Sequence, residues 1–506
     1  MQSKFQNTRF LALVHAIIIG TLIGLVVSCF RLAIEKMLTI FTSLYQQASS
    51  HLLILGLIIV LNVLIALIVS MWVKQTPAIS GSGIPQVEGQ LAGEYDSKWF
   101  PVLWKKTIGG ILAIGSGLML GREGPSIQLG AAIGQGWSDF RHFEGSDKRV
   151  LIASGSAAGL SAAFNAPIAS TLFVLEEIYH NFSPLVWISA LTSAVMSNFI
   201  SLNFFGLKPV LAIRYAHALP LSMYWQLLVL GILLGLAGRF YQIVLLQLTK
   251  WYAAISFLPR WMDGLVPLLV VIPLGLFSPH ILGGGNSLVP QIAQQSHLLL
   301  PIISLLVIRF VFSMISYGSG LPGGIFLPIL TLGAIIGALY VTVMAQLNLI
   351  NPVYLPNFVI YAMAGYFACI GKAPFTAILL VTEMVGSLQH LMPLAVVSLT
   401  AYIIVDLLGG EPIYESLLHQ LVPELIQNPS GLQDHIEFPI FEGSDLDGIT
   451  VREVKWPENS LLIAIRRGKR EIIPNGDSIL KTGDTLIVST QRSNRAFVKQ
   501  HLTNLY

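Results

Sequence analysis

The stretch Gly121-Arg122-Glu123-Gly124-Pro125 guides the interpretation of the whole sequence. Proline is favoured in the first turn of a helix, and glycine lets the backbone bend and approach a ligand closely. The stretch therefore predicts a helix N-terminus whose free amides carry partial positive charge and attract anions. Glu123 places a carboxylate in that same anion site, which makes it a candidate gate and proton carrier. The alternative is a carboxylate that only caps its helix.

Two other stretches have the same order of glycines, proline and apolar helix. They are Gly81-Ser82-Gly83-Ile84-Pro85 and Gly323-Gly324-Ile325-Phe326-Leu327-Pro328. Three such N-termini that converge within a membrane would form an anion site without any full positive charge. Partial charges also bind weakly enough for an ion to leave, as a transport pathway requires. The alternative for each stretch alone is a turn between packed helices.

The composition indicates a polytopic helical membrane protein. Of the 506 residues, 54% are apolar and only 11% are charged, against about 25% charged in an average soluble domain. The first apolar stretch, from Phe10 to Phe30, is long enough to span a bilayer, and its basic flank predicts a cytoplasmic N-terminus. The net charge of +3 implies no nucleic-acid partner, and Cys29 and Cys369 predict neither a disulfide framework nor a metal site.

The apolar stretches are interrupted and partly repeated. Several are shorter than the roughly 20 residues needed to cross, which is typical of transporters and channels built on broken helices. Seven residues recur 203 positions later: Gly121, Pro125, Leu129, Gly130, Ala131, Ile133 and Gly134. Five recur 207 positions later: Ala166, Pro167, Leu172, Val174 and Glu176. The repeat predicts two related halves with a site at their interface, without saying whether they are inverted.

A second carboxylate candidate follows the apolar run 168–175. An ionisable residue at membrane depth is costly and marks a functional site by default, so Glu177 is a candidate; the alternative is a helix-end carboxylate in the interface. Arg122 is expected only as a salt-bridge partner. A membrane enzyme with Glu123 and Glu177 as acid and base would lack a nucleophile, a metal set and a cofactor motif, so we expect neither enzyme activity nor a cofactor.

Five stretches together resemble the signatures of CLC chloride channels and proton-coupled chloride transporters. In chain order they are Gly81–Pro85, Gly121–Pro125, Ala163–Pro167, Gly323–Pro328 and Gly410–Tyr414. The resemblance implies an all-α polytopic membrane protein, an 18-helix homodimer with one pore per subunit and an inverted repeat of broken helices. The residues that it implies are the hydroxyl ligands Ser82 and Tyr414, the backbone-amide ligands Ile325 and Phe326, the external gating glutamate Glu123 and the internal proton glutamate Glu177.

The same resemblance narrows the transported ions. Nitrate-selective members of the family carry proline at the position of Ser82, and fluoride exporters depart from both the serine and the tyrosine motifs, so we expect chloride. Channel members usually lack the internal glutamate, so Glu177 favours chloride/proton exchange, with a passive chloride channel as the alternative. The expected location is a prokaryotic plasma membrane, with the C-terminal domain in the cytoplasm.

The last part of the chain predicts a small α+β domain. Twenty of the 76 residues from Gly431 to Tyr506 are charged, against 35 of the preceding 430. The joint is expected near Asn428–Gly431, which divides the chain into domains 1–428 and 432–506. We expect short strands at Ser460–Ile465 and Thr485–Ser489 and a helix at Arg495–Leu502.

This order resembles the C-terminal regulatory subdomain of RCK/TrkA proteins (TrkA-C). The resemblance implies dimerisation and a small ligand between subunits, which in some such domains is cyclic di-AMP. The contacts that it implies are Ile465, Arg466, Ile473 and Pro474. Two alternatives remain: a dimer clamp without a ligand, and contact of the basic residues at 466, 467, 469 and 470 with anionic lipid.

Overall fold

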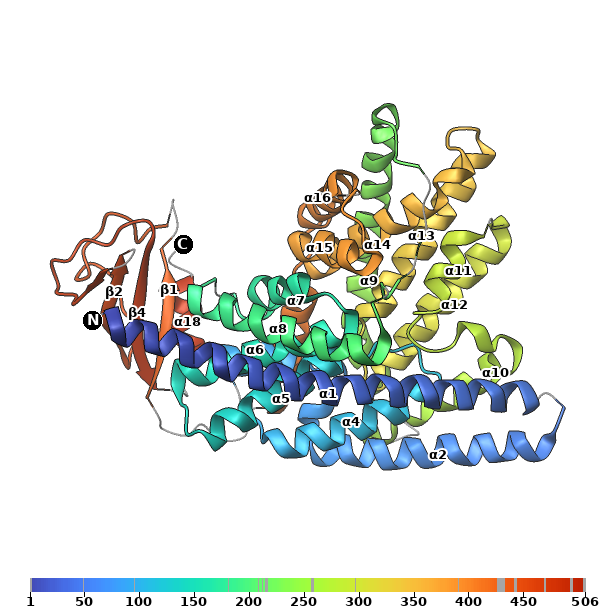
Figure 1. The fold of residues 1–506 in the computed structure, drawn as a ribbon, viewed down its shortest axis with the longest axis horizontal. Helices are drawn as coiled ribbons and strands as arrows, with labels where there is room; N and C mark the ends of the chain where they lie inside the picture. Colours follow the sequence, from blue (N-terminus) through green and yellow to red (C-terminus); the bar gives the residue numbers. More distant parts are fainter. Residues whose placement is uncertain are drawn as a thin grey trace.

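The chain forms a large helical part followed by a small sheet domain (Figure 1). In the computed structural model, the described residues are 2–48, 50–94, 96–180, 182–207, 209–211, 213, 217–255, 259–295, 297–389, 391–425, 433–440, 444–467, 470–491 and 495–503. The predicted joint at Asn428–Gly431 lies outside these residues, so the domain limits remain a prediction.

The helices of the first repeat half are mixed in length. They are α1 (Gln2–Ala48), α2 (Leu52–Gln75), α3 (Ile84–Ala92), α4 (Trp99–Gly115), α5 (Glu123–Phe140), α6 (Gly145–Phe164), α7 (Pro167–Phe173) and α8 (Pro184–Phe205). A π-helical turn, η2 (Val174–Ile178), extends α7. Short 3₁₀-helices, η1 (Pro77–Ile79) and η3 (Leu221–Met223), lie in the connections.

The second half has a similar mixture. Its helices are α9 (Tyr224–Ala253), α10 (Leu265–Phe277), α11 (Leu288–Gln294), α12 (Leu299–Gly318), α13 (Phe326–Gln346), α14 (Leu355–Gly371), α15 (Pro374–Val385), α16 (Leu391–Leu407) and α17 (Ile413–Leu425). Its 3₁₀-helices are η4 (Arg260–Met262), η5 (Pro279–Ile281) and η6 (Pro352–Tyr354). Eight helices of the described part of the chain are long and apolar enough to cross a membrane.

The first helix is longer than the apolar stretch that predicts it. Residues 10–30 form the middle of α1, which continues to Ala48 without an interrupting proline. Gly20 and Gly24 lie one turn apart on the side of α1 that meets α8, and a Cβ on either would overlap the Ser193–Ile200 segment of that helix. Small residues at this spacing let two membrane helices approach closely.

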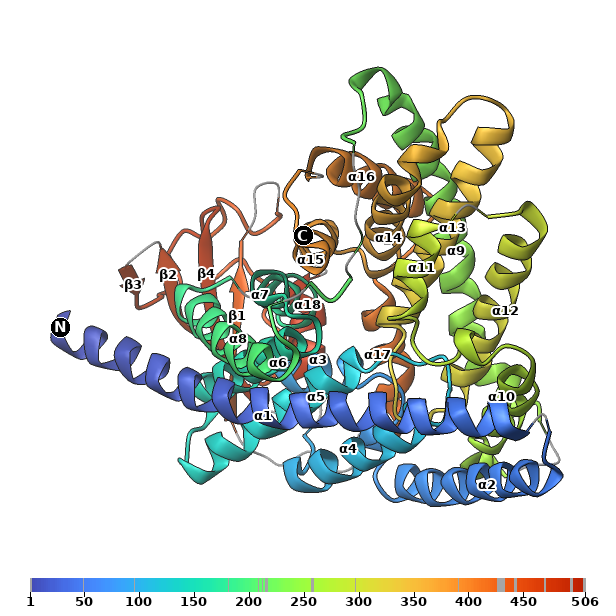
Figure 2. The ribbon, with the colours of Figure 1, turned by 45° about the vertical axis from the view of Figure 1, so that its right-hand side comes forward.

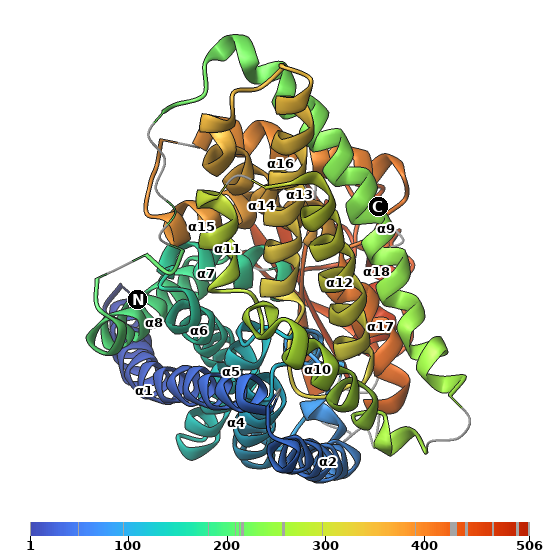
Figure 3. The ribbon, with the colours of Figure 1, turned by 90° about the vertical axis from the view of Figure 1, so that its right-hand side faces the viewer.

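The three predicted helix N-termini are confirmed. The helices α3, α5 and α13 begin at Ile84, Glu123 and Phe326, each one or two residues after a glycine of its stretch. All three starts are buried inside the helical part, where broken helices are tolerated because protein rather than lipid surrounds their ends. Figure 3 shows α13 and α14 enclosed by α9, α11, α12 and α16.

The tail forms an antiparallel sheet with one helix. Its strands are β1 (Gln433–Pro439), β2 (Ser460–Arg467), β3 (Arg470–Ile472) and β4 (Asp484–Gln491), in the order β1-β4-β2-β3. The helix α18 (Arg495–Thr503) packs on β1 and β4. Both predicted strands and the terminal helix are thus confirmed. β1 was not predicted, although its alternating Ile436 and Phe438 point into the core of the domain.

The sheet domain lies at the end of the molecule where α1 begins (Figures 1 and 2). It contacts the start of α6, where Arg149 Nη2 donates a hydrogen bond to the His435 carbonyl at 3.4 Å. Within the domain, the Arg467 guanidinium donates two hydrogen bonds, of 2.7 and 2.6 Å, to the buried Asp484 carboxylate. These bonds hold the pKa of Arg467 above its ordinary value and join β2 to β4.

Candidate functional site

The stretch Gly81–Pro85 makes a tight turn into α3. Gly81 and Gly83 have φ values of 57° and 93°, which glycine adopts without strain. Ser82 lies between them, is buried, and has a hydroxyl oxygen without a hydrogen-bond partner among the described residues. A buried hydroxyl without a partner is costly, so Ser82 is placed to bind a group that does not belong to the chain.

Glu123 is the first residue of α5 and is fully buried. Within the described chain, neither carboxylate oxygen has a hydrogen bond of good geometry. The carboxylate faces the backbone amides of Glu123 itself and of Leu327. Glu123 therefore occupies the space between the N-termini of α5 and α13, where an anion is stabilised by both.

The structure confirms that Arg122 is a salt-bridge partner. Its Nη1 lies 2.6 Å from Glu35 Oε1, while its Nε lies 3.9 Å from Glu123 Oε1. Arg31 also donates to Glu35, at 3.2 Å. The shorter contact of Arg122 is thus with Glu35 of α1, and its contact with the Glu123 carboxylate is at the limit of an ion pair.

Ile325 and Phe326 supply the start of α13. Both are buried, and in the described part of the chain neither backbone amide donates a hydrogen bond to another residue. The first amides of a helix have no acceptor within that helix. These two donors are therefore available to an anion at this point.

Tyr414 brings a fourth helix to the same place. It is the second residue of α17, it is fully buried, and its hydroxyl has no hydrogen-bond partner among the described residues. Its ring packs edge-on against Phe173, with centroids 6.0 Å apart, and Phe173 in turn packs against Phe326 at 5.4 Å. The start of α17 is thus held beside α7 and α13, and α17 also contacts α3.

The predicted ligands converge. A Cβ added to Gly324 would lie 3.3 Å from the Gly124 amide nitrogen and 3.4 Å from Ser82 Oγ. The N-termini of α3, α5 and α13 therefore meet within van der Waals distance. They form a buried group of a hydroxyl and backbone amides, which is the chemistry of a weak anion site. Tyr414 lies near this group because its ring packs on Phe173, which packs on Phe326.

Glu177 lies apart from this group, in the π-helical turn after α7. It is 4% exposed, and its electrostatic neighbours are the carboxylates of Glu88, Glu176 and Glu415. Tyr414 interacts electrostatically with both Glu177 and Glu123. Tyr414 therefore lies near both predicted proton carriers. Glu88 was missed by the sequence analysis because it lies inside a short helix without any motif of its own.

Glu176, next to Glu177, has a structural role. Its carboxylate accepts hydrogen bonds from the Thr376 amide at 2.9 Å and the Thr376 hydroxyl at 2.7 Å. Glu383, its counterpart in the repeat, accepts from the Ile168 and Ala169 amides at 3.2 and 2.8 Å. Each glutamate thus caps a short helix of the other half.

Two buried cations behind the glycine loops were also missed. The Lys106 ammonium donates to the carbonyls of Ile79 and Gly81 at 2.9 and 2.8 Å. Arg309 donates to the carbonyls of Ile281, Gly283 and Gly284 at 2.7–2.8 Å. The two cations are 203 positions apart, which is the offset of the first repeat block. This offset could have identified them as equivalent residues of the two halves.

Comparison with known proteins identifies the family. Residues 65–406 match the family described as voltage gated chloride channel, and residues 435–500 match the TrkA-C domain. The chain belongs to the CLC family. This CLC protein is 35% identical over 427 residues to the H(+)/Cl(-) exchange transporter ClcA of Vibrio parahaemolyticus, with 82% of this chain and 90% of that protein covered. It is 36% identical over 422 residues to ClcA of Vibrio campbellii, at the same coverage.

Solved structures of the family have the same fold. A slow cyanobacterial Cl-/H+ antiporter superposes with a TM-score of 0.77 at 31% identity, covering 82% of this CLC protein and 99% of that chain. A eukaryotic CLC transporter superposes with a TM-score of 0.68 at 22% identity, covering 88% of this protein and 79% of that chain. The second likeness concerns the fold alone.

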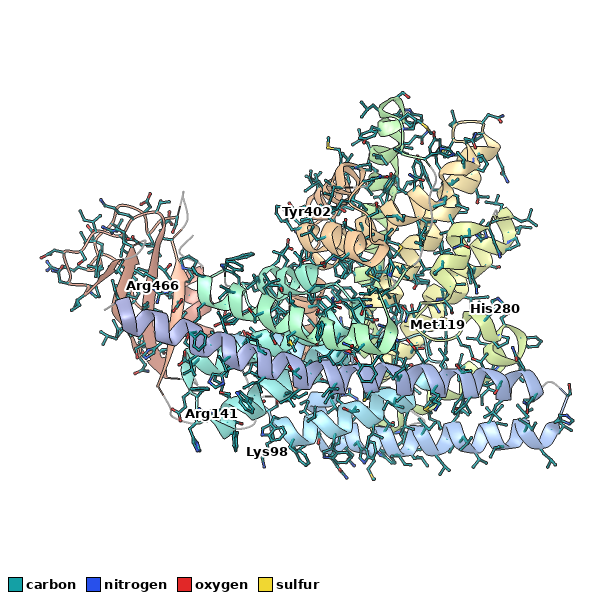
Figure 4. All side chains as sticks on the ribbon, in the orientation of Figure 1. Lys98, Met119, Arg141, His280, Tyr402 and Arg466 are labelled. Carbon is teal, nitrogen blue, oxygen red and sulfur yellow. The ribbon has the colours of Figure 1, made fainter. Side chains whose placement is uncertain are left out.

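The four residues predicted to contact a ligand in the TrkA-C domain differ in burial. Ile465 is 1% exposed and belongs to the core of the domain, so its side chain does not reach the surface. Ile473 is 89% exposed, and Pro474 is partly buried beside it. Arg466, which Figure 4 labels on the sheet, pairs with Glu437 at 3.2 Å. Of the four, Arg466, Ile473 and Pro474 offer surface to a ligand.

Proposed function

We propose that this CLC protein exchanges chloride for protons across a prokaryotic plasma membrane, with its TrkA-C domain on the cytoplasmic side. The observation that carries the proposal is the meeting of Ser82, Glu123 and the start of α13 at one buried place. A second buried glutamate, Glu177, interacts electrostatically with Tyr414. The printed names of the relatives, which are exchange transporters for the same two ions, support the proposal.

The chemistry of the anion group favours a halide. Chloride is an acceptor without a donor proton, and the group presents the hydroxyls of Ser82 and Tyr414 and the amides of Ile325 and Phe326, all of which donate. Donors without a formal charge bind a monovalent anion weakly, so the ion can leave again. We assign the central chloride position to these four residues.

The Glu123 carboxylate competes with chloride for the same amides. When charged, it occupies the anion position; when protonated, it loses that attraction and leaves the position to a chloride ion. A proton that Glu123 binds from one side has to reach the other side without following chloride, and Glu177 supplies a second carboxylate for that step. Exchange results because chloride entry and Glu123 deprotonation exclude each other.

The purified protein in liposomes tests exchange. Chloride-loaded vesicles are diluted into low-chloride buffer while potassium and valinomycin hold the membrane potential at zero. We expect chloride efflux to drive protons inward, so that the external pH rises. Chloride efflux that leaves the external pH unchanged would instead indicate the alternative function, a passive channel.

We also propose that the TrkA-C domain regulates transport as part of a homodimer. Its ligand would be a cyclic dinucleotide held by Arg466, Ile473 and Pro474. Calorimetric titration of the full-length protein with cyclic di-AMP should release heat, and Arg466→Gln should weaken binding because the guanidinium pairs with phosphate. A full-length protein that gives no heat at high micromolar ligand would favour a clamp without this ligand.

A further inference from the structure

A cavity outside the chloride group lies at the end of α2. It has a volume of about 410 Å³ and is bounded by η4, by the loop after α12 and by α17. Lys74, in the last turn of α2, and Arg260, the first residue of η4, both line it. No aspartate or glutamate lines the cavity within the described chain.

The two cations differ in the acidic residues near them. No described residue forms an ion pair with Lys74, whose ammonium lies 5.6 Å from the centre of the Trp261 ring. Arg260 interacts electrostatically with Asp263, which does not line the cavity. Two like charges on one cavity repel each other, and an anion between them removes that repulsion. An anionic group in the cavity would therefore be stabilised by both cations.

The surroundings favour an amphiphilic anion. The α2 helix has mostly lipid-facing residues, since only 28% of its apolar window is buried. Trp261 is exposed beside Lys74, and tryptophan is enriched where the bilayer meets water. Val73, Leu321 and Leu421 give the cavity apolar walls. An acyl chain can follow such walls while its headgroup meets Lys74 and Arg260.

We propose that this cavity binds the phosphate of an anionic lipid headgroup. Arg260 presents a planar fork that matches two phosphate oxygens, and Lys74 adds a point charge. The apolar walls distinguish this ligand from a free inorganic anion, which has no use for them. Basic residues at the membrane surface attract anionic lipid in general, but here a defined cavity fixes the position of the headgroup.

The bound headgroup would touch the loops that carry the chloride ligands. Ser80 and Ser319 both line the cavity. Ser80 Oγ donates to the Gly320 carbonyl at 3.0 Å, and the Gly81 amide donates to the same carbonyl at 3.1 Å. This carbonyl joins the loop of Ser82 to the loop of α13, so lipid in the cavity stabilises the junction of the two loops.

Native mass spectrometry of the full-length protein tests the site. The probes are phosphatidylglycerol and phosphatidylcholine with identical acyl chains, and inorganic phosphate. The test variant is Lys74→Gln with Arg260→Gln, and each single variant is measured as well in case the double variant does not fold. The matched control removes two exposed cations that do not line the cavity, by Lys98→Gln with Arg141→Gln; both residues are labelled in Figure 4.

We expect the wild type to retain one phosphatidylglycerol more tightly than phosphatidylcholine. The double cavity variant should bind it about tenfold or more weakly, each single variant several-fold more weakly, and the control within about twofold of wild type. Equal phosphatidylglycerol binding by wild type and cavity variants would overturn the proposal. Inorganic phosphate that binds as tightly as phosphatidylglycerol would assign the cavity to a soluble anion and would also overturn it.

Discussion

Gly121 and Gly324, which are 203 residues apart, bind each other through two backbone hydrogen bonds of 2.7 Å, each amide donating to the other's carbonyl. The repeat places these two glycines at equivalent positions. Equivalent residues contact each other in this reciprocal way where a local two-fold axis passes between them. The two halves of the helical part are therefore joined about an approximate two-fold axis at the anion group, as in transporters with repeated halves.

The same axis relates the buried cations Lys106 and Arg309, and we predict that both stabilise the fold. Replacing Arg309 by Met removes three hydrogen bonds and leaves three loop carbonyls without these donors, at a cost of about 3 kcal/mol or more. Lys106→Met removes two such bonds and should cost less. Thermal unfolding in detergent measures both, with Lys98→Met as the exposed control. An unchanged midpoint in the Arg309 variant would contradict this role.

Gly124 should tolerate no side chain. A Cβ there would overlap Ser82 Oγ and lie 2.8 Å from the Ser82 carbonyl oxygen, so Gly124→Ala should displace the loop of Ser82 and reduce chloride flux at least tenfold. Gly56→Ala is the control, because no atom lies within 4 Å of its added Cβ. Chloride efflux from liposomes compares the two. A chloride flux equal to that of the wild type in the Gly124→Ala variant would contradict the assignment of Ser82 as a chloride ligand.

Glu123→Gln should abolish proton transport while chloride transport continues. Glutamine has neither a charge to compete with chloride nor a proton to release. The control is Glu35→Gln, which removes the carboxylate that pairs with Arg122 but keeps Glu123 unchanged. Simultaneous recording of pH and chloride in liposome suspensions separates the two variants. Persistent proton movement in the Glu123 variant would disprove its role as proton carrier.

Glu177→Gln should also stop proton movement and spare chloride flux. The neighbouring Glu176→Gln is a sharp control, since Glu176 caps α15 through Thr376 and is not needed as a proton carrier. We expect Glu176→Gln to lower thermal stability by about 1 kcal/mol and to keep proton coupling. If both variants lost coupling equally, the assignment of the proton path to Glu177 alone would be wrong.

Asp484→Asn should loosen the TrkA-C domain. The buried carboxylate accepts two hydrogen bonds from Arg467. Removing one partner of a buried ion pair typically lowers the free energy of unfolding by about 3 kcal/mol. The loss should be smaller here because Arg467 is partly exposed. Asp477→Asn breaks a largely exposed pair with Arg452 and should change little. Limited proteolysis of the full-length protein should cleave the Asp484 variant more than tenfold faster within the tail. Equal cleavage of both variants would contradict this.

Local signals explain what the sequence predicts well. The starts of α3, α5 and α13 follow from glycine and proline at fixed positions, which act through the backbone of the same few residues. The pairing of the two halves follows from repeated residues such as Gly121 and Glu176. Strand β4 is recognisable because half of its residues are β-branched, and strand β2 because it begins with a short apolar run between turn residues.

Long-range contacts explain what the sequence does not predict. Arg309 binds carbonyls 25 to 28 residues away, and a single cation in an apolar run resembles an interfacial residue until those loops are placed. Glu88 is identifiable only when α3 lies beside Glu177. Ile465 illustrates the opposite case: a family resemblance suggests ligand contact, but burial in the sheet core decides where the side chain points.

Bromide substitution tests the position of the bound anion most directly, because bromide replaces chloride and scatters X-rays anomalously. Crystals of the protein grown in bromide should show an anomalous peak between the Ser82 and Tyr414 hydroxyls, within hydrogen-bond reach of the Ile325 and Phe326 amides. The Glu123 side chain should lie on one side of the peak. An ordered structure without a peak at this point, or with bromide bound elsewhere along the helices, would contradict the proposed site.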